Sequence, residues 1–163
     1  MDVATVLTFD DQAQAAAAYY TSIFPRSRLI QTTYAPAGLP ATEGSVMSVS
    51  FELAGRPFLA MNTGPGFAIG QSASLAALCD AQSEVDVYWQ RLLADGGEAL
   101  AYGWLKDRFG VSWQVAPKVL YQLMADHDPG RRARAIAAMM GMGKLDAQAL
   151  LLAADSQELP PSE

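Results

Sequence analysis

The sequence predicts an α+β fold made of two strand–helix–strand–strand–strand modules followed by a helical tail. Both halves of the chain show β-rich runs around one helical pattern, in the same order. Shifting the first helical pattern by 69 positions places Tyr19-Tyr20 on Tyr88-Trp89. Each half also ends in a predicted hairpin whose turn carries a glycine, Gly55 or Gly110. The repeated order and the matched aromatic pair together favour a duplicated unit.

In the first half, hydrophobic periodicity predicts one helix and four strands. The strands are expected at residues 3–9, 28–34, 45–53 and 57–62, and the helix at 12–24. Asp10-Asp11 offers an acidic helix start, and Pro25 ends the helix because proline cannot continue it. Residues 35–44 and 63–70 are rich in glycine and proline, which indicates loops.

The second half repeats this pattern in a shorter form. A strand is expected at residues 73–79, a helix from about 83 to 94, short strands at 98–102 and 103–108, and a last strand at 111–116. The triplet 106–108 is interpreted as a solvated hairpin turn. Tyr20, Trp89 and Trp113 are interpreted as packing residues, and Cys79 as a buried thiol.

The remainder of the chain is predicted to be helical. Helices are expected at residues 119–126, 129–140 and 144–154, with Asp128-Pro129 as cap and first residue of the second one. The expected organisation is therefore paired modules over 1–118 (about 1–64 and 71–117), a helical tail over 119–155, and a disordered end over 156–163. The methionines near residue 140 are expected to pack this tail against the modules.

Charge and cysteine content exclude several classes of function. The chain has 163 residues, a net charge of −6 and no extended basic run, so a nucleic-acid partner is not expected. One cysteine allows no internal disulfide, and no leader or membrane-spanning run is visible, so we expect a cytoplasmic protein without a membrane partner. The glycine-rich stretch 64–70 has proline at its second position and matches no nucleotide-binding fingerprint.

Short motifs spread over nearly the whole chain carry a family resemblance. They lie at residues 9–10, 19–20, 22–25, 44–47, 51–53, 58–62, 64–65, 84–89, 103–107 and 109–115. With these motifs the chain resembles the PhnB-like (demethylubiquinone methyltransferase-like) branch of the vicinal oxygen chelate superfamily, which includes glyoxalases and bleomycin-resistance proteins. The resemblance implies that the two modules pair into a cup-shaped mixed sheet. In enzymes of the superfamily, that cup holds a divalent metal through His, Glu or Gln.

The resemblance also implies which positions would hold the metal. Carried over residue by residue, they are Gln114 and Ser74 in the second module and Thr5 in the first. The fourth position is Leu59 by the spacing from the turn glycine, or Asn62 in another hairpin register. Divalent cations prefer imidazole or carboxylate ligands, which this set lacks. We therefore expect no catalytic metal and no cofactor.

The preferred interpretation is a metal-free small-molecule-binding protein of the glyoxalase/bleomycin-resistance type, with an apolar ligand of unknown identity. Asn62, Ser74, Trp104 and Gln114 are the candidate ligand-binding residues. One alternative is an enzyme of the superfamily (lyase, dioxygenase or transferase-like) with a divergent site. Another is a dimeric interaction module with a filled cup. A homodimer is expected in each case, because twofold symmetry is the commonest arrangement.

Overall fold

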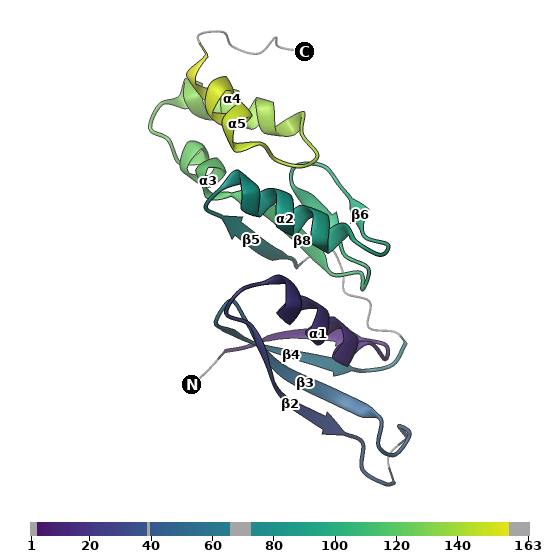
Figure 1. The fold of residues 1–163 in the computed structure, drawn as a ribbon. Helices are drawn as coiled ribbons and strands as arrows, with labels where there is room; N and C mark the ends of the chain where they lie inside the picture. The colour runs from purple at the N-terminus through teal and green to yellow at the C-terminus, as the bar shows by residue number, and fades with distance from the viewer. Residues whose placement is uncertain (1–2, 39, 66–72, 157–163) are drawn as a thin grey trace. The chain divides into compact units, whose positions relative to one another are not determined.

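The computed structural model describes residues 3–38, 40–65 and 73–156 and confirms the predicted α+β fold. The chain forms two compact units, Met1–Gly70 and Gln71–Glu163. Each contains a four-stranded mixed sheet with one helix packed on it (Figure 1). The expectations for residues 66–72 and 157–163 lie outside the described residues.

Unit 1 contains strands β1 (Thr5–Phe9), β2 (Arg28–Tyr34), β3 (Val46–Leu53) and β4 (Arg56–Asn62), and helix α1 (Ala13–Ile23). The strand order is β1-β4-β3-β2, with β1 parallel to β4 and the other pairs antiparallel. Helix α1 crosses one face of this sheet (Figure 1). All five predicted elements are therefore present, with boundaries within two residues of those expected.

The core of unit 1 lies between α1 and the sheet. Period-two alternation directs Val49, Phe51 and Leu53 of β3 toward the helix, and all three are buried. Tyr20 of α1 is fully buried, and its ring stacks on Phe51 with centroids 6.5 Å apart. No helix formed by the described residues of unit 1 covers the opposite face of the sheet; we call it the open face of unit 1.

Unit 2 repeats the arrangement with strands β5 (Leu75–Cys79), β6 (Glu98–Ala99), β7 (Trp104–Lys106) and β8 (Ser112–Pro117), and helix α2 (Gln82–Leu93). The order β5-β8-β7-β6 matches that of unit 1, and β5 runs parallel to β8. Trp113 and Val115 of β8 are buried on the α2 side, as is Cys79. The face opposite α2 is called the open face of unit 2; at its end, Ala116 of β8 is buried against helices that follow β8.

Two predicted strands of unit 2 are shorter than expected. Residues 98–102 and 103–108 form only the two-residue β6 and the three-residue β7. Tyr102 and Gly103 interrupt them because both adopt positive φ angles, 62° and 80°. Their backbone N–H groups donate to the carbonyls of Met142 and Gly143, at 2.8 and 2.7 Å. A segment of the tail thus takes the hydrogen bonds that a continued strand would have used.

The tail forms three helices, α3 (Lys118–Met124), α4 (Pro129–Met140) and α5 (Ala147–Asp155), and belongs to unit 2. Its buried residues form one apolar cluster with Ala116 of β8: Leu120, Leu123, Ala135, Leu145, Leu150 and Ala154. Met139 and Met142 pack against this cluster, whereas Met140 is 60% exposed. The predicted cap holds, since the Asp128 carboxylate accepts from the Gly130 N–H at 2.8 Å.

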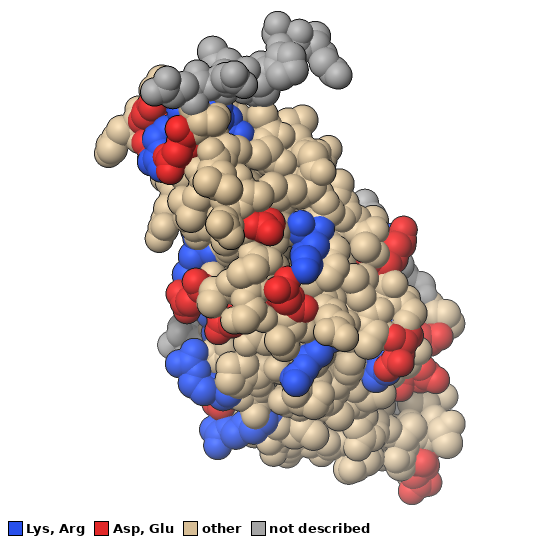
Figure 2. Space-filling view, turned by 45° about the horizontal axis from the view of Figure 1, so that its top comes forward, with Lys and Arg blue, Asp and Glu red and all other residues tan. Residues whose placement is uncertain are grey.

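Charged side chains of both signs are interspersed on the face of the molecule drawn in Figure 2. This face carries no extended basic patch of the kind that binds nucleic acid. Among the helices formed by the described residues, none has the length and apolar character needed to cross a bilayer.

Candidate functional site

The two sheets define which positions of the modules are equivalent. Phe58 of β4 pairs with Thr5, and Trp113 of β8 pairs with Leu75. Leu59 and Gln114, the next residues, are therefore equivalent, and each lies four positions after its turn glycine. Both project toward the open face of their sheet, because their neighbours along the strand are buried under the helix. By register, the residue of unit 1 that is equivalent to Gln114 is therefore Leu59 and not Asn62.

The first strands are related by a shift of 70 positions, not the 69 that relates the helices. Three residues separate β1 from α1, whereas two separate β5 from α2. Thr5 is consequently equivalent to Leu75, and it shares the helix-covered face of β1 with Leu7 and Phe9. Ser74 is exposed and lies one residue before β5. Thr5 and Leu59 therefore lie on opposite faces of the unit 1 sheet.

Gln114 and Trp104 are brought together on the open face of unit 2. The two residues are directly paired across β7 and β8, which places their Cβ atoms about 5 Å apart. The Tyr121 hydroxyl of α3 donates to Gln114 Oε1 at 2.6 Å. Partial burial raises the pKa of the Tyr121 phenol, which keeps it protonated as a donor at neutral pH. The three side chains form what we call the Gln114 cluster.

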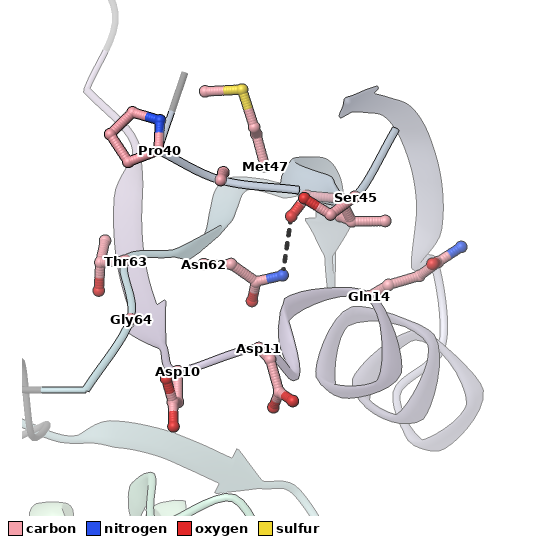
Figure 3. Close-up of a pocket in the computed structure, with 11 residues that line it drawn as sticks. Asp10, Asp11, Gln14, Pro40, Ser45, Met47, Asn62, Thr63 and Gly64 are labelled. Atoms are coloured by element: carbon pink, nitrogen blue, oxygen red, sulfur yellow. Dashed lines mark hydrogen bonds between the residues drawn. The ribbon is translucent and has the colours of Figure 1, made fainter. Parts of the chain in front are cut away.

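The side chain of Asn62, at the end of β4, makes hydrogen bonds to both α1 and β3. Its Oδ1 accepts from the backbone N–H of Ala13, the first residue of α1, at 2.8 Å. Its Nδ2 donates to the Val46 carbonyl at 2.9 Å, the bond dashed in Figure 3. The expected helix start at Asp10-Asp11 is not used, since the N-cap is Gln12 and its side chain makes no cap bond. Asn62 supplies this bond from across the sheet.

An open cavity of about 650 Å³ lies in unit 1 where β1 and β4 end. It is lined by Asp10, Asp11, Gln14, Pro40, Ala41, Ser45, Val46, Met47, Asn62, Thr63 and Gly64. Figure 3 shows Asp10 and Asp11 on one side of Asn62, and Pro40 and Met47 on the other. The cavity therefore combines carboxylate acceptors with an apolar wall.

Sequence reasoning missed two features of these sites. Tyr121 was expected only as part of a tail helix, because nothing in its local pattern shows that α3 reaches Gln114. Asp10 and Asp11 were expected to start a helix, and their position at the cavity depends on the parallel pairing of β1 and β4. Both are long-range consequences of topology.

The donor chemistry of the equivalent positions does not fit a divalent metal. Leu59 offers no ligand atom, and the Gln114 oxygen already accepts from Tyr121. No group of three or more His, Cys, Asp or Glu side chains with metal-binding geometry occurs within the described ranges. His127 lies at the junction of α3 and α4, between Asp126, which pairs with Arg131, and the capping Asp128.

Comparison with solved structures identifies the fold. A PhnB protein from Bacillus cereus is 28% identical, with a TM-score of 0.65; the match covers 72% of this chain and 99% of that one. A protein from Pseudomonas aeruginosa is 18% identical, with a TM-score of 0.60, over 72% and 98% of the two chains. The fosfomycin resistance protein FosX from Listeria monocytogenes is 18% identical, with a TM-score of 0.55, over 75% and 94%.

Comparison of sequences identifies the family. No curated protein matches the chain. The sequence model of the family described as 3-demethylubiquinone-9 3-methyltransferase matches residues 1–116, which comprise unit 1 and unit 2 as far as Ala116, the last residue but one of β8. The resemblance expected from the sequence motifs is thereby confirmed. The chain belongs to this PhnB-like family of the vicinal oxygen chelate superfamily.

Proposed function

We propose that the chain is a small-molecule-binding protein of the glyoxalase/bleomycin-resistance type that works without a catalytic metal. The observation that carries this proposal is the pair of equivalent positions Leu59 and Gln114. One is aliphatic, and the other is a neutral amide whose oxygen accepts from Tyr121. Neither side chain offers coordination strong enough to offset the free energy that a divalent cation loses when it gives up its bound water.

The remaining groups near these positions support the same proposal. Thr5 lies on the helix-covered face, and Ser74 offers a neutral hydroxyl. FosX was solved with Mn(II), so a fold of this kind can hold a metal in another protein. A metal in this chain would need ligands at other positions.

Metal content tests the proposal directly. Protein purified without chelator should contain far less than one equivalent of manganese, zinc, nickel or iron by mass spectrometry. Added Mn(II), Zn(II) or Ni(II) should leave the melting temperature unchanged, because only a ligand that binds the native state raises it. Stoichiometric metal that resists dialysis, or a rise in melting temperature with one ion, would contradict the proposal.

Ligand binding separates this function from that of an interaction module. A thermal-shift screen of small organic molecules should yield ligands that raise the melting temperature with increasing concentration. The cavity of unit 1 and the Gln114 cluster of unit 2 are the two places where the proposal puts them. A screen without any stabilising molecule would favour the interaction module.

We also propose that the protein is a cytoplasmic homodimer. The single cysteine, Cys79, is buried and reduced, which suits a reducing compartment. Closed twofold dimers are the commonest assemblies of soluble chains. Light scattering should give twice the 17.4 kDa chain mass at micromolar concentration; a monomer would contradict the dimer and leave the ligand proposal intact.

A further inference from the structure

The family model ends at residue 116, before the three tail helices begin. Family membership therefore gives no account of α3, α4 and α5. Yet the tail is bonded to the body of unit 2 at several places. Gln82 of α2 donates to the Leu145 carbonyl at 3.0 Å and accepts from the Ala147 N–H at 2.9 Å. With the bonds at Tyr102 and Gly103, these contacts hold residues 142–147 against unit 2, and α3 packs on Leu145 and on Ala116 of β8 in the apolar cluster.

This attachment brings one polar tail side chain to the open face. Leu120 and Leu123 of α3 are buried in the tail cluster, whereas Tyr121 is 39% exposed. Its hydroxyl meets the Gln114 oxygen at 2.6 Å. A carboxamide whose oxygen is engaged in this way presents its N–H₂ group on the other side. The tail therefore determines which end of the amide is available.

The surroundings of the amide are also set by the sheet. Within the described part of the chain, neither the Gln114 N–H₂ group nor the Trp104 indole N–H has a protein partner. Ala76 pairs with Gln114 on its other side, and Leu78, two residues further along β5, is 50% exposed. Two side chains that carry donors are thus cross-strand neighbours next to apolar surface. Further along β7, Lys106 pairs with Glu98, so charges of both signs are present there.

We infer that Tyr121 is a specificity-determining residue, contributed by the C-terminal helices, of a site on the open face of unit 2. The ligand it selects is a small molecule that carries a carbonyl or carboxylate oxygen on a flat apolar body. The oxygen accepts from Gln114 and Trp104, and the body lies against the apolar side chains of β5. This inference rests on the proposed small-molecule function and names the chemical class of the ligand.

Two probes of similar shape test the selection: acetophenone, which only accepts hydrogen bonds, and benzylamine, which donates them. Side-chain N–H signals of Gln114 and Trp104 report binding in ¹H–¹⁵N spectra. The full chain should bind acetophenone more tightly and shift both signals. In Tyr121→Phe the Gln114 carboxamide is free to rotate and exchange the positions of its oxygen and nitrogen. The ratio of the affinities for acetophenone and benzylamine should therefore fall about fivefold, the effect of one neutral hydrogen bond. A merely structural role would lower the melting temperature and leave this ratio unchanged.

Tyr88→Phe is the matched control, since Tyr88 lies on α2, at the other face of the same sheet. It should leave the preference intact. An unchanged ratio in Tyr121→Phe, or shifts confined to other residues, overturns the inference while the proposed function stands. If neither probe shifts any signal, the inference fails. The proposed function fails with it only if the thermal-shift screen also yields no ligand.

Discussion

The carboxylate of Asp107 organises the turn between β7 and β8. It is 3% exposed, not solvated as its charged neighbours in the sequence suggested. Its Oδ1 accepts from the backbone N–H groups of Phe109 and Val111, at 2.9 and 3.0 Å, and its Oδ2 from the Trp113 indole at 2.8 Å. A buried carboxylate with three donors is a strong local constraint.

Asp107→Asn should therefore be costly. The amide nitrogen replaces one acceptor and faces a donor, so the free energy of unfolding should fall by about 2–3 kcal/mol. Asp95→Asn is the control, because Asp95 is exposed and pairs with Arg108, and it should lose about 1 kcal/mol or less. Urea unfolding followed by tryptophan fluorescence measures both. Equal losses would show that burial of Asp107 contributes nothing.

Cys79 gives the protein a predictable response to alkaline pH. Burial raises the pKa of its thiol to about 12, with the charges of Glu84 and Asp80 adding to the effect. In the unfolded chain the thiol titrates near 8.5. The unfolded state alone loses this proton as pH rises above that value. The contribution of this thiol to the free energy of unfolding is therefore complete below about pH 8.5. It is lost progressively as pH rises toward about 12.

The free energy of unfolding should fall with pH more steeply in the wild type than in Cys79→Ala. The difference in slope should approach about 1.4 kcal/mol per pH unit above pH 8.5. Urea titrations in reducing buffer at several pH values between neutrality and about pH 10 measure it. Parallel slopes for the two proteins would rule out a buried protonated thiol.

At the scale of elements, the two module helices begin differently. The first N–H group of α1, that of Ala13, donates to the side-chain oxygen of Asn62 at the end of β4. The equivalent position in unit 2 is Pro117, which cannot serve. There Glu84, inside α2, accepts from the backbone N–H of Asp80 at 2.7 Å, and Lys118 pairs with the Asp80 side chain. The repeat conserves the helix but not the way its first turn is held.

Asn62→Ala should therefore act on stability. Losing the helix cap and the Val46 bond should lower the free energy of unfolding by about 1–2 kcal/mol. Gln14→Ala is the control: it lines the same cavity and makes no cap bond, and its effect should stay within about 0.5 kcal/mol. Thermal and urea unfolding measure both. Asn62→Ala with wild-type stability would contradict the structural role of these two bonds.

Sequence periodicity was sufficient to find these helices and most strands, because α1, α2 and the strands each carry one buried face. Boundaries failed where a distant segment intervened. At Tyr102 and Gly103 the ladder is replaced by bonds to Met142 and Gly143, which no local pattern encodes. The role of Asn62 and the contact of Tyr121 with Gln114 were hidden for the same reason. Local sequence patterns therefore predict the helices and strands. The site also depends on long-range contacts between these elements, which local patterns do not encode.

At the scale of the whole chain, the tail is an integral part of unit 2. Gly103 is one place where the two are in close contact. A Cβ there would lie 2.7 Å from Leu145 Cδ1 and 2.9 Å from the Val115 carbonyl oxygen. Only glycine allows both the positive φ and this approach.

Gly103→Ala and Gly110→Ala form a matched pair. Gly110 also has a positive φ, but a Cβ there meets nothing within 4 Å. Gly110→Ala should cost about 1–2 kcal/mol from backbone strain alone. Gly103→Ala should cost at least about 1 kcal/mol more, because the clash forces the tail away from the sheet. Urea unfolding gives the difference, and faster amide exchange at residues 102 and 103, whose N–H groups donate to the tail, should accompany it; equal costs would contradict close packing here.

The bond between Gln82 and Leu145 spans 63 residues of sequence. Unit 1, in contrast, pairs all its strands within the first 70 residues. During synthesis the chain emerges from its N-terminus, and units fold as their residues become available. We therefore expect the first unit to fold on the ribosome while the second, with its helix already made, waits for residues beyond 145. Between those moments, the open face that will carry the Gln114 cluster is exposed to chaperones and proteases.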